Sequence, residues 1–283
     1  MYEYAEREII DYDYTSGDNS YTTSTVTDPW VIIKKISPML TTLWRQDSPF
    51  NDNTPIKGFL VTPEHAPAGC VPIAVAQIMA YHEYPTSLTC NGVLCDWKKM
   101  KTVYSISNYN KSDVSAQIQV ANFVSNIGAW CKTFYWVGLI SKYGFALPKN
   151  AKDCMKLFGY SNAERYYGYY ESKAKEMLDN GKPFFLAAIS GAVNGHAWVV
   201  DGSIVREQKI RTVNNSTGQT ISSSTKTEYL VHCNWGWGGK ANGYYASGVF
   251  KPKNGTVMTE PGVDFNFGSS NSNFWYGFHM ITY

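Results

Sequence analysis

The sequence lacks a marked excess of charge of either sign. Its 283 residues include 25 Lys and Arg and 23 Asp and Glu, which gives a formal net charge of +2. Proteins that bind nucleic acid or a membrane surface by electrostatic attraction ordinarily concentrate basic residues. The balance supports neither class, and we expect no nucleic acid among the partners.

The sequence also lacks a long hydrophobic run. No stretch approaches the roughly 18 consecutive apolar residues that a membrane-spanning helix needs, so we expect no membrane span. Residues 1–10 are acidic, whereas a signal peptide starts with basic residues and continues with apolar ones. If the protein is exported, we expect the signal to lie outside this chain.

Cysteine is present, but not in a metal-binding pattern. There is no CxxC pair and no histidine at finger-like spacing, so we predict no structural zinc site. Four or five of the thiols are expected in the core, and Cys90 with Cys95 could close a small loop in an oxidising compartment. Cys70 needs another explanation. The cysteines stand at positions 70, 90, 95, 131, 154 and 233.

Aromatic residues are abundant. They make up 15% of the chain, while charged residues make up 17%, which is the opposite of the composition of disordered proteins. The chain is therefore expected to be globular, and its length suggests about two lobes.

The first half of the chain is predicted to be mostly helical after a polar leader. Residues 11–27 are rich in Ser and Thr and show no periodicity, so residues 1–37 are interpreted as an extended leader. Asp28 and Pro29 predict a short helix in the stretch WVIIKKI, ended by Ser37 and Pro38. Further helices are predicted over residues 70–84, 113–132, 151–158 and 172–180. The first of these is apolar on nearly every face, which is typical of a buried central helix.

The second half is predicted to be mostly antiparallel sheet. The stretches FFLAAIS, HAWVVDGSIV, TEYLVHCNW, GYYASGVF and WYGFHMITY are of strand type and are separated by Gly, Asn and Ser. NNSTGQTISSSTK is expected to form an exposed hairpin tip, and NFGSSNSNF a mobile loop. The fold class is therefore α+β.

Cys70 follows Gly69 and opens the buried helix. At a helix start, unpaired N–H groups and the helix dipole favour a thiolate over a thiol, so this position suits a nucleophile. A small buried residue packed at a helix start is the alternative, because cysteine is often buried.

Among the five histidines, His196 is the favoured partner for this thiol. It begins the strand-like run AWVVDG after a flexible Asn-Gly approach, and such junctions border clefts. His82 lies twelve residues after Cys70 on the same helix, about 18 Å away by helical rise, which excludes it. His232, inside a predicted strand, is the main competitor. His279 lies in the last strand, and His65 is expected in an exposed loop.

A cysteine–histidine pair also needs a group that orients the imidazole and donors for the oxyanion. Asn234 precedes the block WGWGG, where Trp235 and Trp237 could cover the pair. Packing aromatics with glycines at a bulge is the alternative. The Cys70 N–H and the Gln46 side chain are candidate oxyanion donors.

The stretch GCVPIAVAQIMAYHEYP resembles the active-cysteine segment of streptopain-like cysteine proteases, family C10 of the papain-like clan. HAWVVDG and HCNWGWGG resemble that family's histidine and tryptophan segments in the same order, and PMLTTLWRQDSPFN resembles its glutamine segment. The resemblance covers most of residues 38–283. It implies a papain-like fold with a mostly helical lobe over 38–181, a mostly β lobe over 182–283 and a cleft between them.

The resemblance assigns roles to five residues. It makes Cys70 the nucleophile, His196 the base and Gln46 the oxyanion donor, with Asn234 and Trp235 supporting the histidine. The sequence departs from the family pattern in two places. Pro72 stiffens the first turn of the helix, and Val193-Asn194 replaces a more glycine-rich approach to the histidine, which bears on the width of the pocket beside it.

The expected function is a cysteine endopeptidase that acts through an acyl-enzyme without metal or organic cofactor. Its expected partners are protein or peptide substrates. The resemblance also implies a secreted or cell-envelope bacterial protein with an inhibitory pro-domain, of which residues 1–37 would be a remnant. The alternatives are an acyl transferase or peptide crosslinker on the same scaffold, and a binding protein of this fold without turnover.

Overall fold

The computed structural model describes residues 23–103, 113–139, 141–190, 194–259 and 273–283. These residues form two compact units. The smaller contains residues 23–35 and 203–230, and the larger contains residues 36–202 and 231–283. The fold is α+β, as predicted, and both units share strands β11 and β12.

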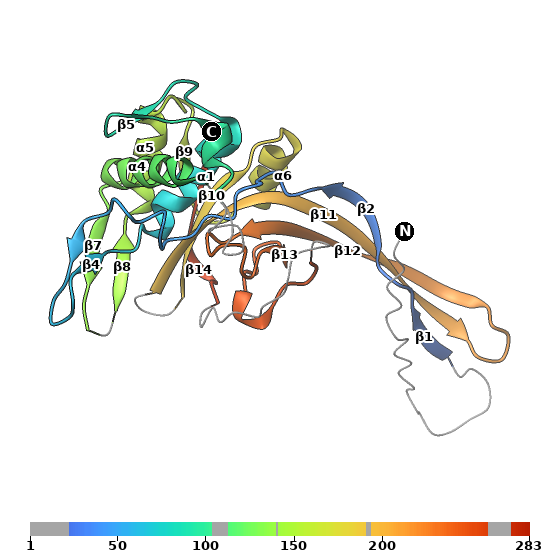
Figure 1. Ribbon diagram of the computed structural model, residues 1–283. Helices are drawn as coiled ribbons and strands as arrows, with labels where there is room; N and C mark the ends of the chain where they lie inside the picture. Colours follow the sequence, from blue (N-terminus) through green and yellow to red (C-terminus); the bar gives the residue numbers. More distant parts are fainter. Residues whose placement is uncertain (1–22, 104–112, 140, 191–193, 260–272) are drawn as a thin grey trace. The chain divides into compact units, whose positions relative to one another are not determined.

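Helix α1, Cys70–His82, is the central element of the larger unit. Every residue from Val71 to Ala80 is buried, as its apolar composition predicts. The helix contacts α4, α5 and strand β10 (Figure 1). It ends at Glu83, whose left-handed backbone closes the last turn with N–H bonds to preceding carbonyls. Burial on all sides fixes the position of its first residue, Cys70.

The other predicted helices are present with small shifts in their bounds. Helix α4 is capped by the side chain of Asp113, which accepts from the Ser115 N–H. Helix α5 begins with Pro148, which lacks only an N–H that would have no partner in the helix. Their bounds are α4 Val114–Trp130, α5 Pro148–Leu157 and α6 Glu171–Asp179. A short helix that was not predicted, α2, spans Trp97–Met100.

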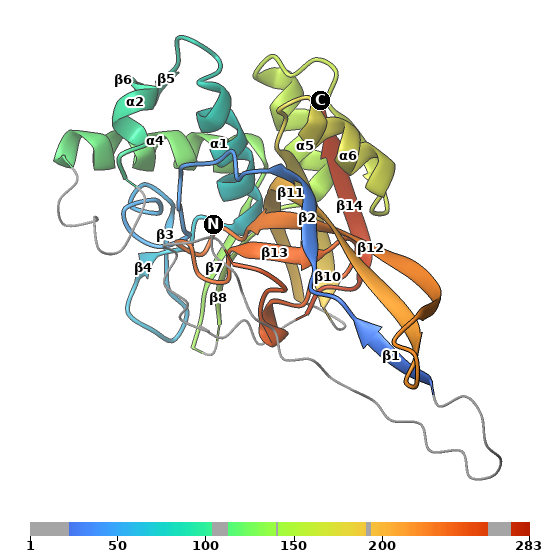
Figure 2. The same ribbon diagram turned by 90° about the vertical axis from the view of Figure 1, so that its right-hand side faces the viewer.

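The sheet of the larger unit is antiparallel and centred on strand β10, Phe184–Ser190, which has the predicted bounds. Strands β11 and β14 pair with its two sides, and His196 lies opposite Ala188 in this register. The sheet order is β13-β12-β11-β10-β14-β9. Strands β10 to β14 are labelled in Figure 2. The remaining bounds are β9 Glu164–Tyr167, β11 Asn194–Asn214, β12 Thr220–Asn234, β13 Gly243–Ala246 and β14 Tyr276–Thr282.

Three short hairpins in the first half were not predicted. Their strands of two to four residues are too short to carry a recognisable alternation. The hairpins are β3 Ile56–Lys57 with β4 Glu64–His65, β5 Thr89–Cys90 with β6 Val93–Leu94, and β7 Phe134–Val137 with β8 Lys142–Phe145. A single 3₁₀ turn, η1, spans Pro252–Asn254.

The leader contains strands, which corrects the predicted helix after Pro29. Strand β1, Thr23–Thr27, and strand β2, Val31–Ile36, both pair with β11. The stretch WVIIKKI is rich in β-branched side chains, which favour a strand. Strand β11 supplies the backbone partners, with Thr23 opposite Asn214 and Thr27 opposite Ile210. Asp28 and Pro29 favour a helix, but pairing with β11, which is far away in the sequence, stabilises a strand instead.

Two predicted loops have different outcomes. The exposed tip in NNSTGQTISSSTK is present but shorter, because β12 already begins at Thr220. The Asn214 side chain closes the turn by accepting from the N–H groups of Ser216 and Thr217. The predicted mobile loop NFGSSNSNF lies almost entirely outside the described residues. Among the described helices, none has the length and apolarity to cross a bilayer.

Candidate active site

Cys70 is the first residue of α1, at a point where the main chain before the helix packs closely against strand β8. Gly69 precedes it with φ of 94°, a conformation that favours glycine. A Cβ on Gly69 would lie 2.8 Å from the Gly144 carbonyl oxygen in strand β8, which a side chain could not tolerate. Cys70 itself is half-buried and packs against the main hydrophobic core. The glycine thus lets the chain enter the helix tightly against β8.

His196 lies on strand β11, and this strand passes close to Cys70. The backbone N–H of Ala197, the next residue, lies close enough to the Cys70 thiol to act on its pKa, in the lowering direction. His196 is 8% exposed. The structure therefore brings together the segments that carry the predicted nucleophile and the predicted base.

The imidazole of His196 is oriented by a backbone carbonyl. Its Nε2 lies 2.8 Å from the carbonyl oxygen of Trp235. Because a carbonyl only accepts, Nε2 carries the proton and Nδ1 is the basic atom. Aromatic rings pack around the imidazole, with the Trp237 centroid at 4.6 Å, Phe274 at 5.7 Å and Trp235 at 6.0 Å.

Burial sets the charge state of this pair. It lowers the pKa of His196 to about 4, an effect that the hydrogen bond to the Trp235 carbonyl only partly offsets. It also raises the pKa of Cys70, although N–H groups of Ala197, Val71 and Cys70 itself act in the opposite direction. The predicted stabilisation of a thiolate at the helix start is thus outweighed by desolvation. Both shifts favour the neutral forms, a thiol at Cys70 and an uncharged imidazole at His196.

Gln46 is held close to the start of helix α1 by its backbone. Its carbonyl accepts from the N–H of Ala68, two residues before Cys70, at 2.9 Å. The residue is half-buried, and its neighbours Arg45 and Asp47 form an ion pair at 3.4 Å. This position suits the oxyanion role that the resemblance implies.

The Asn234 side chain hydrogen-bonds other groups of the site. Its Nδ2 donates to the Thr42 carbonyl at 2.8 Å, and its Oδ1 accepts from the Gly236 N–H at 3.1 Å and from Gln77 Nε2 at 3.3 Å. The imidazole instead contacts the carbonyl of the following residue, Trp235. Asn234 thus shapes the turn that presents this carbonyl.

Sequence reasoning missed two side chains of this region. Gln77 lies within the apolar helix α1. That it is the one amide side chain of this helix is the sequence feature that could have drawn attention to it. Asn242 accepts from the Trp235 N–H through Oδ1 at 3.0 Å and so helps to hold the same turn. Nothing in its local sequence, KANGYY, indicates that partner.

Three of the other four histidines have hydrogen-bond partners of their own, and the fourth, His279, contacts the Tyr167 ring. His232 Nδ1 lies 2.6 Å from Asp201 Oδ1, and both side chains are buried. His82 bonds the Tyr283 hydroxyl, and His65 bonds the Thr54 carbonyl. His279 stands in β14 opposite Tyr167 of β9.

The other thiols are paired with neighbours or buried. Cys90 and Cys95, expected to be able to close a loop, are free thiols that lie close enough to shift each other's pKa. Cys154 likewise lies close enough to Cys131 to raise its pKa. Among the described residues, no group of three His, Cys, Asp or Glu is placed to hold a metal ion.

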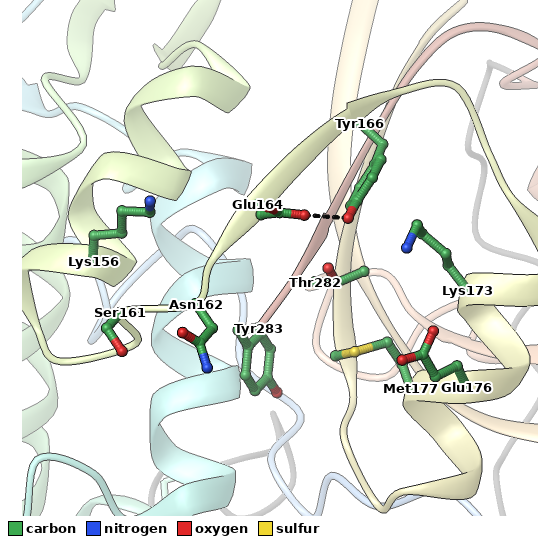
Figure 3. A pocket seen from close by; sticks show the side chains of 10 residues that line it. All are labelled: Lys156, Ser161, Asn162, Glu164, Tyr166, Lys173, Glu176, Met177, Thr282 and Tyr283. Carbon is green, nitrogen blue, oxygen red and sulfur yellow. Dashed lines mark hydrogen bonds between the residues drawn. The ribbon is translucent and has the colours of Figure 1, made fainter.

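A separate hollow of about 440 Å³ lies among α5, α6, β9 and the end of β14 (Figure 3). Figure 3 shows Glu164 bonded to the Tyr166 hydroxyl and Lys173 beside the same ring, consistent with a cation–π contact at 4.5 Å. Cys70, His196 and Gln46 are not among its lining residues. It is therefore distinct from the candidate active site.

The sequence and the fold match known proteins. The model of the Peptidase C10 family matches residues 44–245, so the chain belongs to this family. It is 23% identical over 241 residues to Streptopain of Streptococcus pyogenes, covering 74% of this chain and 54% of that protein. It is 25% identical over 229 residues to the Thiol protease/hemagglutinin PrtT of Porphyromonas gingivalis, covering 74% and 23%. The chain thus spans about half the length of Streptopain.

Two solved structures share the fold. Active wild-type interpain A, a cysteine protease of Prevotella intermedia, superposes with a TM-score of 0.61 at 22% identity, covering 87% of this chain and 94% of that one. A fragment of prointerpain A superposes with a TM-score of 0.55 at 21% identity, covering 90% and 76%. The predicted papain-like fold is confirmed.

Proposed function

We propose that the protein is a cysteine endopeptidase in which Cys70 is the nucleophile and His196 the general base. The observation that carries this proposal is the position of the Ala197 N–H beside the Cys70 thiol, where it acts to lower the thiol pKa. The thiol therefore lies beside strand β11, which carries His196. The imidazole of His196 is buried, and its Nδ1 is the basic atom. Family membership supports the same class of reaction.

In the first half of the reaction, Cys70 Sγ attacks the peptide carbonyl while its proton passes to His196 Nδ1. The Cys70 N–H and the Gln46 amide would donate to the developing oxyanion. The tetrahedral intermediate collapses when imidazolium gives its proton to the leaving amine. The products are the free amine and a thioester on Cys70.

In the second half, neutral His196 takes a proton from water, and the hydroxide attacks the thioester. The imidazolium then returns the proton to the Cys70 sulfur, and the acid is released. The Trp235 carbonyl accepts from Nε2 throughout, so it favours the cationic form of the ring when it forms. We infer from the directions of the two pKa shifts that the resting pair is neutral, so that proton transfer accompanies the attack on substrate.

Secretion and synthesis as a zymogen remain parts of the proposal. The relatives come from bacteria, and one solved structure is a fragment of a pro-form. In the described residues, the segment before Ile36 pairs with strand β11. An inhibitory role for residues 1–37 would require this segment, or residues before it, to limit access of substrate.

The test is to map cleavage sites in a denatured protein mixture by mass spectrometry, with Cys70→Ala as the control. We expect new termini with the wild type and none with the variant. A labelled peptide with an added amine separates hydrolysis from the acyl-transferase alternative. Intact peptides with both proteins would favour the non-catalytic alternative and overturn the proposal.

A further inference from the structure

Helix α1 carries one amide among apolar side chains. Gln77 is fully buried and lies seven residues after Cys70, about two turns along the same helix face. An apolar side chain would fill this position without the need for hydrogen-bond partners, whereas burying an amide is costly unless it is hydrogen-bonded. The contacts of Gln77 therefore bear on its role.

Gln77 bonds two segments that are far apart in the sequence. Its Oε1 accepts from the Thr42 hydroxyl at 3.0 Å and from the Trp44 N–H at 3.3 Å. Its Nε2 donates to Asn234 Oδ1 at 3.3 Å. Thr42 and Asn234 are each 2% exposed. In such a dry environment each bond has greater weight than at the surface.

Each of the two segments carries a part of the proposed machinery. The Asn234 amide also accepts from the Gly236 N–H, so it braces the turn around Trp235, whose carbonyl orients His196. The Trp44 segment continues to Gln46, whose carbonyl is bonded to Ala68 just before the nucleophile. Gln77 lies on the same helix as Cys70. Its amide therefore contacts both the segment that supports His196 and the segment that leads to Gln46.

We propose that Gln77 is a positioning residue for peptide hydrolysis, which acts through Asn234 and the Thr42–Trp44 segment and touches no reacting atom. This inference rests on the proposed function. Its physical basis is that a displacement of about 1 Å in an active site can lower the rate about 100-fold. Without the Gln77 bonds, Asn234 loses a donor, and Thr42 and Trp44 lose their acceptor.

The role requires an amide and not merely a side chain of this length. Oε1 must accept two hydrogen bonds while Nε2 donates one. In Gln77→Glu, an ionised carboxylate would face Asn234 Oδ1 without a proton to donate. A protonated carboxyl would restore the donor. Since burial raises a carboxyl pKa, the variant should approach wild-type behaviour as the pH falls.

The experiment compares Gln77→Met, Gln77→Glu and a matched control, Gln119→Met. Gln119 is a buried amide on α4 whose Oε1 accepts from the Asp96 N–H at 2.8 Å, away from the three catalytic segments. Active protein is normalised by titration of Cys70. Gln77→Met should lower kcat about 10- to 100-fold with little change in KM, because misplacement acts on the reacting groups. Gln119→Met should lose stability but keep kcat.

Two further readouts complete the test. The ratio of kcat for Gln77→Glu to wild-type kcat should rise between pH 7 and pH 5. The rate of Cys70 alkylation by iodoacetamide should change in Gln77→Met and not in Gln119→Met. This rate reports the arrangement of the site even if the wild type cleaves no peptide, an outcome that would overturn the proposed function separately.

The positioning role is overturned by a folded Gln77→Met protein with wild-type kcat and alkylation rate. It is also overturned if Gln119→Met loses kcat to the same extent, because the effect would then follow general stability. A wild-type kcat for Gln77→Glu that persists up to pH 9, where the carboxyl is ionised, would show that the donated proton is not needed.

Discussion

His196 is oriented by the main chain of Trp235, through a 2.8 Å contact between Nε2 and the carbonyl oxygen. A backbone acceptor cannot be removed by mutation of its own side chain. The orientation therefore depends on the turn that holds residue 235, and this turn is bonded by Asn234 and Asn242. Changes at either asparagine would act on the imidazole from a distance.

The buried imidazole should make stability depend on pH. The pKa of His196 is lowered to about 4 in the folded protein, while an unfolded histidine titrates near 6.5. The unfolded state therefore binds more protons between these values, and stability should fall as the pH decreases from about 6.5 to about 4. The loss attributable to His196 should reach about 3 kcal/mol.

Urea unfolding of wild type and His196→Gln at pH 7 and pH 4.5 measures this contribution. The difference between the two pH values should be smaller in the variant, since glutamine does not titrate. An equal pH dependence in both proteins would show that His196 takes up its proton as easily when folded as when unfolded.

Alkylation of Cys70 should increase with pH over the neutral range. Burial raises the pKa of this thiol, and the reactive species is the thiolate. The rate constant with iodoacetamide should therefore rise steadily from pH 5 to pH 8, measured by peptide mass spectrometry. A plateau across this range would instead indicate a stable thiolate–imidazolium pair.

Iodoacetamide should also label Cys70 before it labels the thiols that are buried in the core. It is half-buried, whereas Cys131, Cys154 and Cys233 are buried, so reagents reach it more easily. Faster labelling of any of these three in the folded protein would contradict the assignment of the nucleophile.

Loss of either member of the pair should abolish most activity. Cys70→Ala and His196→Ala should each lower kcat by about 10³-fold or more, because the thiol and imidazole act as a unit. For the same reason the double variant should be little worse than either single one. Single-turnover kinetics on a peptide substrate measures the three rates. A double variant that loses the product of both factors would mean that the two residues act independently.

The sequence predicts several of the helices and strands but few of the contacts between them. The apolar run after Cys70 predicts a buried helix, and FFLAAIS predicts β10 within its observed bounds, because local pattern reflects burial. The Trp235 carbonyl has no sequence signature, since every residue has one. The strand at Val31–Ile36 was missed because its partner, β11, lies more than 160 residues later in the chain.

Asp201 should be a strong contributor to stability. This fully buried carboxyl lies 2.6 Å from His232 Nδ1, and its other oxygen accepts from the Leu40 N–H at 3.0 Å. Asp201→Ala leaves both groups buried without this partner, and the expected cost is about 3–5 kcal/mol of unfolding free energy. Urea unfolding at pH 7 is the measurement.

A surface carboxyl provides the matched control for Asp201. Asp153 forms ion pairs with Lys149 and Lys152 in which both partners keep solvent contact. Asp153→Ala should therefore cost no more than about 1 kcal/mol. Equal losses in the two variants would mean that the buried pair contributes no more than a surface one.

Gln46 is the residue whose proposed role depends most on the family. A side-chain amide that donates to the oxyanion acts mainly in the transition state, so Gln46→Ala should lower kcat and leave KM nearly unchanged. Removal of one such donor costs about 10²- to 10³-fold in kcat, and we expect the lower part of this range because the Cys70 N–H remains. Cys70 alkylation should persist. If Gln46 only stabilises the loop next to Ala68, the variant should instead melt earlier and show a raised KM with wild-type kcat.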